Sequence, residues 1–126
     1  AKSGIEQGKC MPLNKAAVLH SASAESIKAR KAVTVLTYLH GVKECITVVP
    51  EIQAAGYDVD VIEMRSLKPL DMATIRSSLE KTNKCIILDE STRSGGVGAT
   101  ISSAIHEELF DLLDAPVRRL SMTDAP

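Results

Sequence analysis

Hydrophobic positions along the chain follow two alternating spacings from residue 32 onward. A continuous apolar, β-branched run over residues 32–38 predicts a strand covered on both faces. Apolar side chains then recur at helical spacing and predict a helix that stops at Gly56; they are Val42, Cys45, Ile46, Val49 and Ile52. Because Pro50 removes a backbone donor and crowds the preceding turn, we expect this helix to kink or split there.

The alternation of strands and helices continues to the end of the chain. Further strands are predicted over residues 57–64, 85–89 and 117–120. Asp71 is a suitable N-cap for a second helix, and a glycine-rich turn over residues 94–98 leads into a third. Their inner faces are predicted to carry Met72, Ile75 and Leu79 in one helix and Ile101, Ala104, Ile105 and Leu109 in the other. This order predicts an α/β domain with a mostly parallel sheet.

The first 31 residues show only weak periodicity and are rich in Ala, Ser and Lys. They do not begin with Met and contain no signal-type apolar core, so they lack the pattern of a secretory signal. Their scarcity of acidic residues would fit the remnant of a transit peptide, but a surface lead-in is the commoner explanation. We therefore expect a lead-in or interdomain linker over residues 1–31 and one domain over residues 32–126.

Composition and charge limit the classes of function. A chain of 126 residues has the length of one domain. Its net charge of −1 and aromatic content of 2% disfavour nucleic-acid binding, and no apolar run is long enough to span a bilayer. Cys10, Cys45 and Cys85 form no C-x-x-C pair, which argues against a disulfide framework or a zinc site and favours a reducing compartment.

The glycine-rich segment, Ser-Gly-Gly-Val-Gly-Ala over residues 94–99, is the most conspicuous motif. Glycines between a strand and a helix can hold a phosphate with backbone N–H groups. However, the spacing differs from the dinucleotide fingerprint, the P-loop Lys-Ser/Thr pair is absent, and no strand supplies a ribose-binding acid. A structural turn formed by Gly95, Gly96 and Gly98 is therefore favoured, with a small nucleotide-binding module as the weaker alternative.

Other polar residues carry weaker signals. His106, Glu107 and Glu108 are contiguous and point to different sides of a helix, which favours a solvated helical face over a metal or acid–base site. Cys45 lies on the apolar face of its helix, which favours a core cysteine over a nucleophile paired with His40. Charged residues at strand ends, expected to support turns or ion pairs, are Arg65, Asp89 and Glu90.

Asp114 differs from these residues because it stands in an apolar turn, Leu-Leu-Asp-Ala-Pro over residues 112–116. A carboxylate held beside a rigid proline can bind an Arg or Lys of a partner protein. An aspartate that merely begins a turn would produce the same pattern. The residues alone leave both interpretations open.

Five motifs occur together in a fixed order. They are Tyr-Asp-Val-Asp-Val-Ile-Glu-Met-Arg-Ser-Leu-Lys-Pro-Leu-Asp (57–71), Lys-Thr (81–82), Asp-Glu (89–90), Arg-Ser-Gly-Gly-Val-Gly-Ala (93–99) and Leu-Asp-Ala-Pro (113–116). The series closely resembles the C-terminal domain of the beta subunit of pyruvate dehydrogenase, the thiamine-diphosphate-dependent decarboxylase component. The resemblance runs from residue 11 to residue 126 and is greater to plastid and cyanobacterial versions than to mitochondrial ones.

The resemblance implies a transketolase-type C-terminal fold, a three-layer α/β/α domain on a five-stranded, mostly parallel mixed sheet. In that family thiamine diphosphate and Mg lie outside this domain, between the alpha subunit and the N-terminal domain of the beta subunit. The family's Gly-Asp-Gly cofactor motif is absent from this sequence. The resemblance therefore implies no catalytic, cofactor-binding or metal-binding residue here. The whole enzyme would oxidatively decarboxylate pyruvate and acetylate a lipoyl group, and the isolated domain would be inactive.

The role implied for the domain is assembly. The implied partners are the alpha subunit, a second beta subunit and the peripheral-subunit-binding domain of dihydrolipoyl acetyltransferase. The acid that matches Asp114 lies where that docking domain binds in the family, which favours the partner-binding interpretation of Asp114. Gly95, Gly96 and Gly98 would shape a turn near the subunit interface. The implied location is the plastid stroma, with the mitochondrial matrix and the bacterial cytoplasm as alternatives.

The sequence departs from the family pattern in three places. Pro50 falls where the family has an uninterrupted helix, and Leu39 and His40 stand where it has a small polar residue. The family also carries a Pro-Tyr segment and a last helix beyond the part that ends at Pro126. These departures leave one alternative, a stand-alone domain of this fold that serves as a structural subunit of a different large complex.

Overall fold

The computed structural model describes residues 15–37, 41–64, 70–89 and 97–121. The elements along these segments are β1 (Ala17–His20), α1 (Ala24–Lys28), β2 (Ala32–Thr37), α2 (Gly41–Ala54), β3 (Asp58–Glu63), α3 (Met72–Thr82), β4 (Cys85–Asp89), α4 (Val97–Glu108), the 3₁₀ turn η2 (Phe110–Leu112) and β5 (Arg118–Ser121). All the strands and helices predicted after residue 31 are present, with their bounds shifted by a few residues at most.

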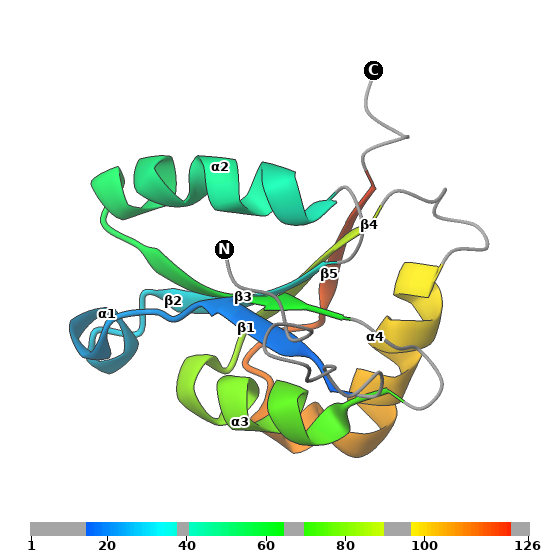
Figure 1. The fold of residues 1–126 in the computed structure, drawn as a ribbon. Coiled ribbons are helices and arrows are strands. Elements are labelled where there is room, and N and C mark those ends of the chain that lie inside the picture. The colour runs from blue at the N-terminus through cyan, green and yellow to red at the C-terminus, as the bar shows by residue number, and fades with distance from the viewer. Residues whose placement is uncertain (1–14, 38–40, 65–69, 90–96, 122–126) are drawn as a thin grey trace, which may run out of the picture.

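The strands form one five-stranded sheet in the order β1-β3-β2-β4-β5. β2, β3, β4 and β5 run parallel, whereas β1 pairs antiparallel with β3 at one edge. Helix α2 covers one face of the sheet, and α3 and α4 cover the other (Figure 1). The fold class expected from the sequence, a three-layer α/β/α domain on a mostly parallel mixed sheet, is confirmed.

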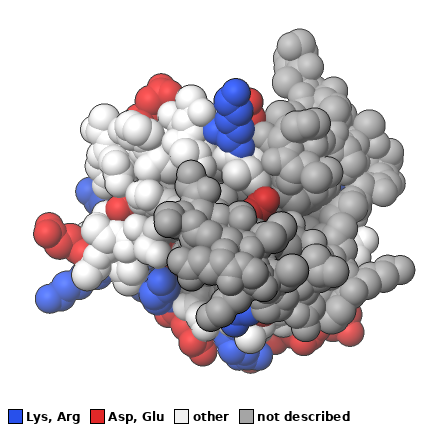
Figure 2. All heavy atoms as spheres, viewed as in Figure 1, with Lys and Arg blue, Asp and Glu red and all other residues white. Residues whose placement is uncertain are grey.

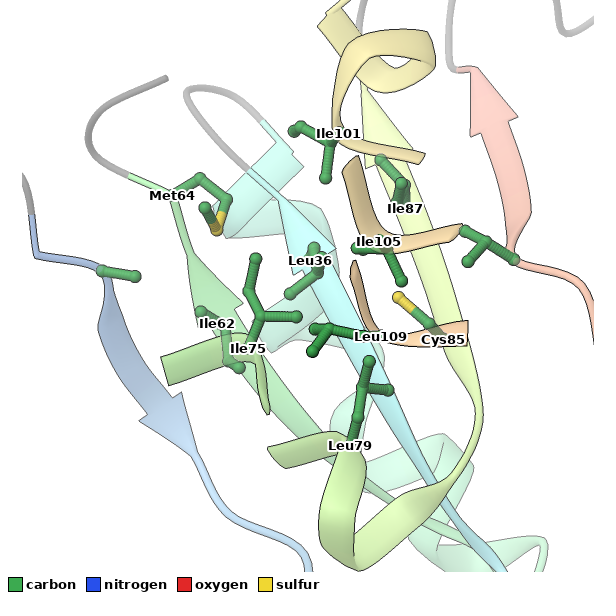
Figure 3. Packing of buried hydrophobic residues seen from close by; sticks show 12 residues of the cluster. Leu36, Ile62, Met64, Ile75, Leu79, Cys85, Ile87, Ile101, Ile105 and Leu109 are labelled. Atoms are coloured by element: carbon green, nitrogen blue, oxygen red, sulfur yellow. The ribbon is translucent and has the colours of Figure 1, made fainter. Parts of the chain in front are cut away.

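The larger core lies between the sheet and the pair α3 and α4. In Figure 3, side chains of the strands, such as Leu36 and Ile62, point toward Ile75 and Leu79 of α3 and Ile105 of α4. A smaller core on the opposite face joins α2 to the sheet through Cys45, Val49, Val59 and Val61. The side chains predicted for the inner faces of the three helices are buried or half-buried in these two cores. The exception is Ile46 of α2, which is 41% exposed.

Helix α2 runs through Pro50 without a break, so of the two expected outcomes the split is wrong, and the kink stays a prediction. A proline at this position removes one backbone hydrogen bond, to the carbonyl of Ile46 one turn earlier. Both Pro50 and Ile46 lie on the exposed face of the helix, where water can satisfy that carbonyl. The buried contacts of Cys45 and Val49 hold the helix to the sheet on the other side.

The segment assigned to a lead-in contains two elements that its weak periodicity did not reveal, β1 and α1. β1 has four residues and α1 has five, too few for a helical or strand repeat to stand out. β1 nevertheless belongs to the sheet, with Ala17 opposite Glu63 and Val18 opposite Ile62 before the register shifts by one residue.

Asp60 of β3 joins these first elements to α3. Its side chain is 1% exposed, and its Oδ1 accepts a hydrogen bond from the backbone N–H of Ala22, just before α1, at 2.7 Å. Oδ2 accepts from Ser78 Oγ at 2.7 Å and lies 3.1 Å from Lys81 Nζ, both on α3. Ser78 Oγ in turn contacts the buried hydroxyl of Thr34 in β2. A buried carboxylate is tolerated when it is paired and hydrogen-bonded in this way, and loss of one of its partners would be destabilising.

Asp58, two residues earlier on β3, holds the start of α1. Burial acts to raise its pKa, but hydrogen bonds from the backbone N–H groups of Ser23 and Val59, each 2.9 Å long, outweigh burial and hold the pKa below its usual value. Gln53 and the ring of His20 lower the pKa further. A carboxyl of this kind stabilises the folded state above its unfolded pKa of about 3.9.

We expect the free energy of unfolding to decrease as the pH falls through about 4 toward the lowered pKa of Asp58, because the unfolded chain then binds a proton that the folded chain does not. Asp58→Asn should remove part of this pH dependence and lower the stability at neutral pH. Urea denaturation from about pH 7 to about pH 3 measures both effects, with the exposed Asp111→Asn as the control. An unaltered pH slope in Asp58→Asn would contradict the assignment.

Asp71 is the N-cap of α3, as predicted. Its Oδ1 accepts a hydrogen bond from Thr74 N at 3.1 Å, and its Oδ2 accepts from Ala16 N, next to β1, at 2.8 Å. Because Asp71→Ala removes both bonds, it should destabilise the fold by about 1–2 kcal/mol. Denaturant titration tests this expectation, with Glu80→Ala on the exposed side of α3 as the control. Equal stability of the two variants would show that the cap contributes nothing.

Candidate functional site

The structure places the predicted site residues at opposite edges of the sheet. Gly98 follows β4 and is the second residue of α4, at the carboxyl edge of the parallel strands; it is buried and helical, and so is not part of the turn itself. Asp114 precedes β5 and lies at the amino edge. Asp114 and Gly98 therefore do not form one site. Other predicted residues lie outside the described ones: His40, Arg65, Glu90, Gly95 and Gly96.

Asn83 fixes the loop that carries Asp114. Asn83 is the C-cap of α3 in the left-handed conformation (φ 59°), and its N–H donates to Leu79 O at 2.9 Å. Its side-chain Nδ2 donates to Leu112 O at 2.8 Å, and its carbonyl oxygen accepts from Asp114 N at 2.8 Å. The loop is thus tied on both sides to the end of a helix that packs in the main core.

Arg30 lies opposite Asp114 and forms an ion pair with it through Nη2 and Oδ2, across 84 positions of sequence. Arg30 ends α1 in a Schellman motif, in which Arg30 N donates to Ile27 O at 3.0 Å and Lys31 N donates to Ser26 O at 2.8 Å. Glycine commonly fills this position because φ is positive, here 60°. An L-residue with a side chain pays about 1–2 kcal/mol there.

The ion pair is open to solvent, since the side chain of Arg30 is 64% exposed and that of Asp114 39% exposed. Lys84 Nζ adds a second cation by donating to Arg30 O at 3.2 Å. Exposed pairs of this kind contribute about 0–1 kcal/mol. The backbone of Asp114 is therefore held in place by Asn83, whereas its carboxylate is paired only weakly, with Arg30.

An apolar strip begins beside Asp114 and continues over β4 and β5. Its first part is a pocket of about 160 Å³ that includes Ala115 and Pro116, directly after Asp114, together with Ile86. Ile86 also lines the second part, a groove of about 230 Å³ between the sheet and α2; Val35, Cys45, Val48, Ile52, Leu88 and Leu120 lie along it. Leu120 is 47% exposed. Within the part of the chain that the structure describes, α2 is the one helix on this face (Figure 1).

On the other side of the Asp114 loop, Phe110 of η2 is 63% exposed and its ring contacts His106 at a centroid distance of 6.5 Å. The expected solvated face is correct for Glu107 and Glu108 but wrong for His106, which is half-buried. His106 Nε2 accepts a hydrogen bond from Val117 N at 3.3 Å, because β5 begins against this turn of α4. His106 thus links α4 to β5.

The two described cysteines are core residues. Cys45 and Cys85 are buried and unbridged. Burial raises the pKa of the Cys45 thiol and raises that of Cys85 to about 12. Both thiols therefore stay protonated near neutral pH, which disfavours a nucleophilic role. Among the described residues, no group of His, Cys, Asp and Glu is arranged to hold a metal ion, and no helix is long and apolar enough to cross a membrane.

A polar hollow of about 500 Å³ lies between β1 and α3 and includes Asp60, Ser78 and Lys81. Asp60 already accepts hydrogen bonds at both carboxylate oxygens, and Lys81 is its ion-pair partner. These contacts assign the acidic group a structural role.

On the described part of the face in Figure 2, basic and acidic side chains are interspersed, in keeping with the net charge of −1.

The sequence did not indicate the two residues that surround Asp114. Asn83 carried a usable signal, since it directly follows the periodic positions of α3 and asparagine tolerates the left-handed C-cap conformation. Arg30 carried none, because its partner lies on a distant loop that only the sheet order brings near.

Comparison with known proteins identifies relatives of this chain by sequence. The chain is 43% identical over 103 residues to the pyruvate dehydrogenase E1 component subunit beta of Chaetosphaeridium globosum, a match that covers 82% of this chain and 32% of that protein. It is 39% identical over 109 residues to the chloroplastic subunit beta-2 of Arabidopsis thaliana, covering 86% of this chain and 27% of that protein. The chain thus spans between a quarter and a third of the length of the curated relatives it matches.

A solved structure described as a split gene transketolase, inactive beta4 tetramer, has the same fold. It superposes with a TM-score of 0.73 at 22% identity, over 92% of this chain and 35% of that one. The family model for the transketolase C-terminal domain matches residues 22–126. Because this match covers most of the chain, the chain belongs to the transketolase C-terminal domain family.

Proposed function

We propose that this chain is the C-terminal domain of the beta subunit of a pyruvate dehydrogenase, and that it serves subunit assembly and docking to the dihydrolipoyl acetyltransferase core. Identity of about 40% with pyruvate dehydrogenase beta subunits over most of the chain supports the assignment. The whole enzyme would oxidatively decarboxylate pyruvate and reductively acetylate lipoyl groups.

The chemistry belongs to other parts of that enzyme. Thiamine diphosphate with Mg would bind between the alpha subunit and the N-terminal domain of the beta subunit, outside this chain. The alpha subunit and a second beta subunit would be the partners in the assembled enzyme. The chloroplastic relatives favour the plastid stroma as the location. This chain alone would have no dehydrogenase activity.

The observation that supports the docking role is the position of Asp114 at one end of a partly exposed apolar strip. A carboxylate on a loop tied to Asn83, directly before Ala115 and Pro116, offers a partner both an ion pair and an apolar contact. Protein interfaces combine these features, with apolar anchors at the centre and charged pairs that select the partner. The partner expected here is the peripheral-subunit-binding domain of dihydrolipoyl acetyltransferase, which would present a basic side chain to Asp114.

Charge removal at Asp114 tests this role. Asp114→Asn keeps the side-chain shape and should weaken binding of the docking domain at least about tenfold, because it leaves the partner's cation unpaired. Asp114→Lys should weaken it further. Isothermal titration of the purified docking domain into the native polypeptide measures the affinity.

Asp111→Asn is the matched control, because it removes the same charge from the exposed turn η2, three residues earlier. It should bind within about twofold of the wild type, since exposed charges away from the contact contribute little. Equal affinities of Asp114→Asn and Asp111→Asn would exclude Asp114 from the interface.

A further inference from the structure

Arg30 already occupies the carboxylate that the docking role requires. Its guanidinium lies within hydrogen-bonding distance of Asp114 Oδ2, so a basic side chain of a partner meets a carboxylate that is paired within the chain. Lys84 Nζ, bound to the carbonyl of Arg30, adds positive charge at the same place. A cationic partner must therefore displace Arg30 or share Asp114 with it.

The backbone at Arg30 favours a specific use for this side chain. The residue has a φ of 60° in a Schellman motif, where glycine would be unstrained. In this chain a residue with a side chain stands at this position despite the strain, and its guanidinium pairs with Asp114. The pair is largely exposed, so it can open without exposing buried surface.

We propose that Arg30 is an internal competitor for the docking carboxylate, which lowers the affinity for a cationic docking domain and selects partners able to displace a guanidinium. This proposal rests on the docking role of Asp114. Competition, rather than general repulsion, requires that the effect of Arg30 depend on Asp114, and a double-mutant cycle measures that dependence.

The test compares Arg30→Gln with Lys31→Gln in the native polypeptide. Both changes remove one positive charge, and the two positions are adjacent and exposed. Within the described part of the chain, Arg30 forms an ion pair with Asp114, whereas Lys31 forms none with it. Titration with the purified peripheral-subunit-binding domain should give about two- to fivefold tighter binding for Arg30→Gln, the range that an exposed ion pair supports. Lys31→Gln should change the affinity less. The difference in affinity between the two variants should decrease as salt is added, because salt screens exposed charges.

The double variant Arg30→Gln with Asp114→Asn completes the cycle. Its affinity should differ from that of Asp114→Asn alone by no more than Lys31→Gln changes the affinity, because Arg30 has nothing to compete for once the carboxylate is gone. Equal affinities of Arg30→Gln and Lys31→Gln, weaker binding of Arg30→Gln, or a gain that persists beside Asp114→Asn would overturn the competitor role alone. Binding that does not respond to Asp114→Asn would overturn the docking role as well. Circular dichroism of each variant establishes that the fold is retained.

Discussion

The buried carboxylate of Asp60 is the contact on which the rest of the described structure depends. It accepts a hydrogen bond from the backbone before α1 and from Ser78 of α3, and it pairs with Lys81. It therefore sets the position of α1 relative to α3 from the middle of the sheet. Arg30 directly follows the C-cap of α1, Asn83 is the C-cap of α3, and both residues contact Asp114. The geometry of the candidate docking edge thus depends on contacts made inside the domain.

This arrangement explains why a charged group is retained in an aliphatic interior. An isolated carboxylate in such a place would be strongly destabilising, whereas one with a cation and several donors is tolerated. Loss of a hydrogen-bond partner of Asp60 would leave a buried charge incompletely satisfied, whereas the exposed pair at Arg30 contributes only about 0–1 kcal/mol. The domain therefore combines a rigid interior with an edge where ion pairs can exchange. A well-bonded interior with an exposed ion pair at one edge is compatible with the proposed role, in which the domain holds subunits together and binds a partner reversibly.

The sequence predicted the layers of the fold because aliphatic periodicity is strong after residue 32. Asp71 as N-cap and the buried state of Cys45 followed from local rules and are confirmed. β1 and α1 were missed because such short elements carry little periodicity, and they are held by bonds to Asp58, Asp60 and Asp71 that no local pattern reveals. Asp114 was proposed as a partner-binding residue from its turn and from the resemblance and stays a prediction, and its contact with Arg30 depends on the strand order. Local physics thus predicts elements and caps, whereas contacts between distant loops require the topology.

The central claim is that this fold acts as the assembly domain of a pyruvate dehydrogenase beta subunit. The intact mass of the native polypeptide that carries this sequence, measured together with its co-purifying proteins, tests that claim most directly. We expect a chain more than twice the 13.5 kDa of these residues, associated with an alpha subunit and a lipoyl-bearing acetyltransferase. A native chain near 13.5 kDa, bound to a different complex, would contradict it and would mean that the fold serves a structural role elsewhere.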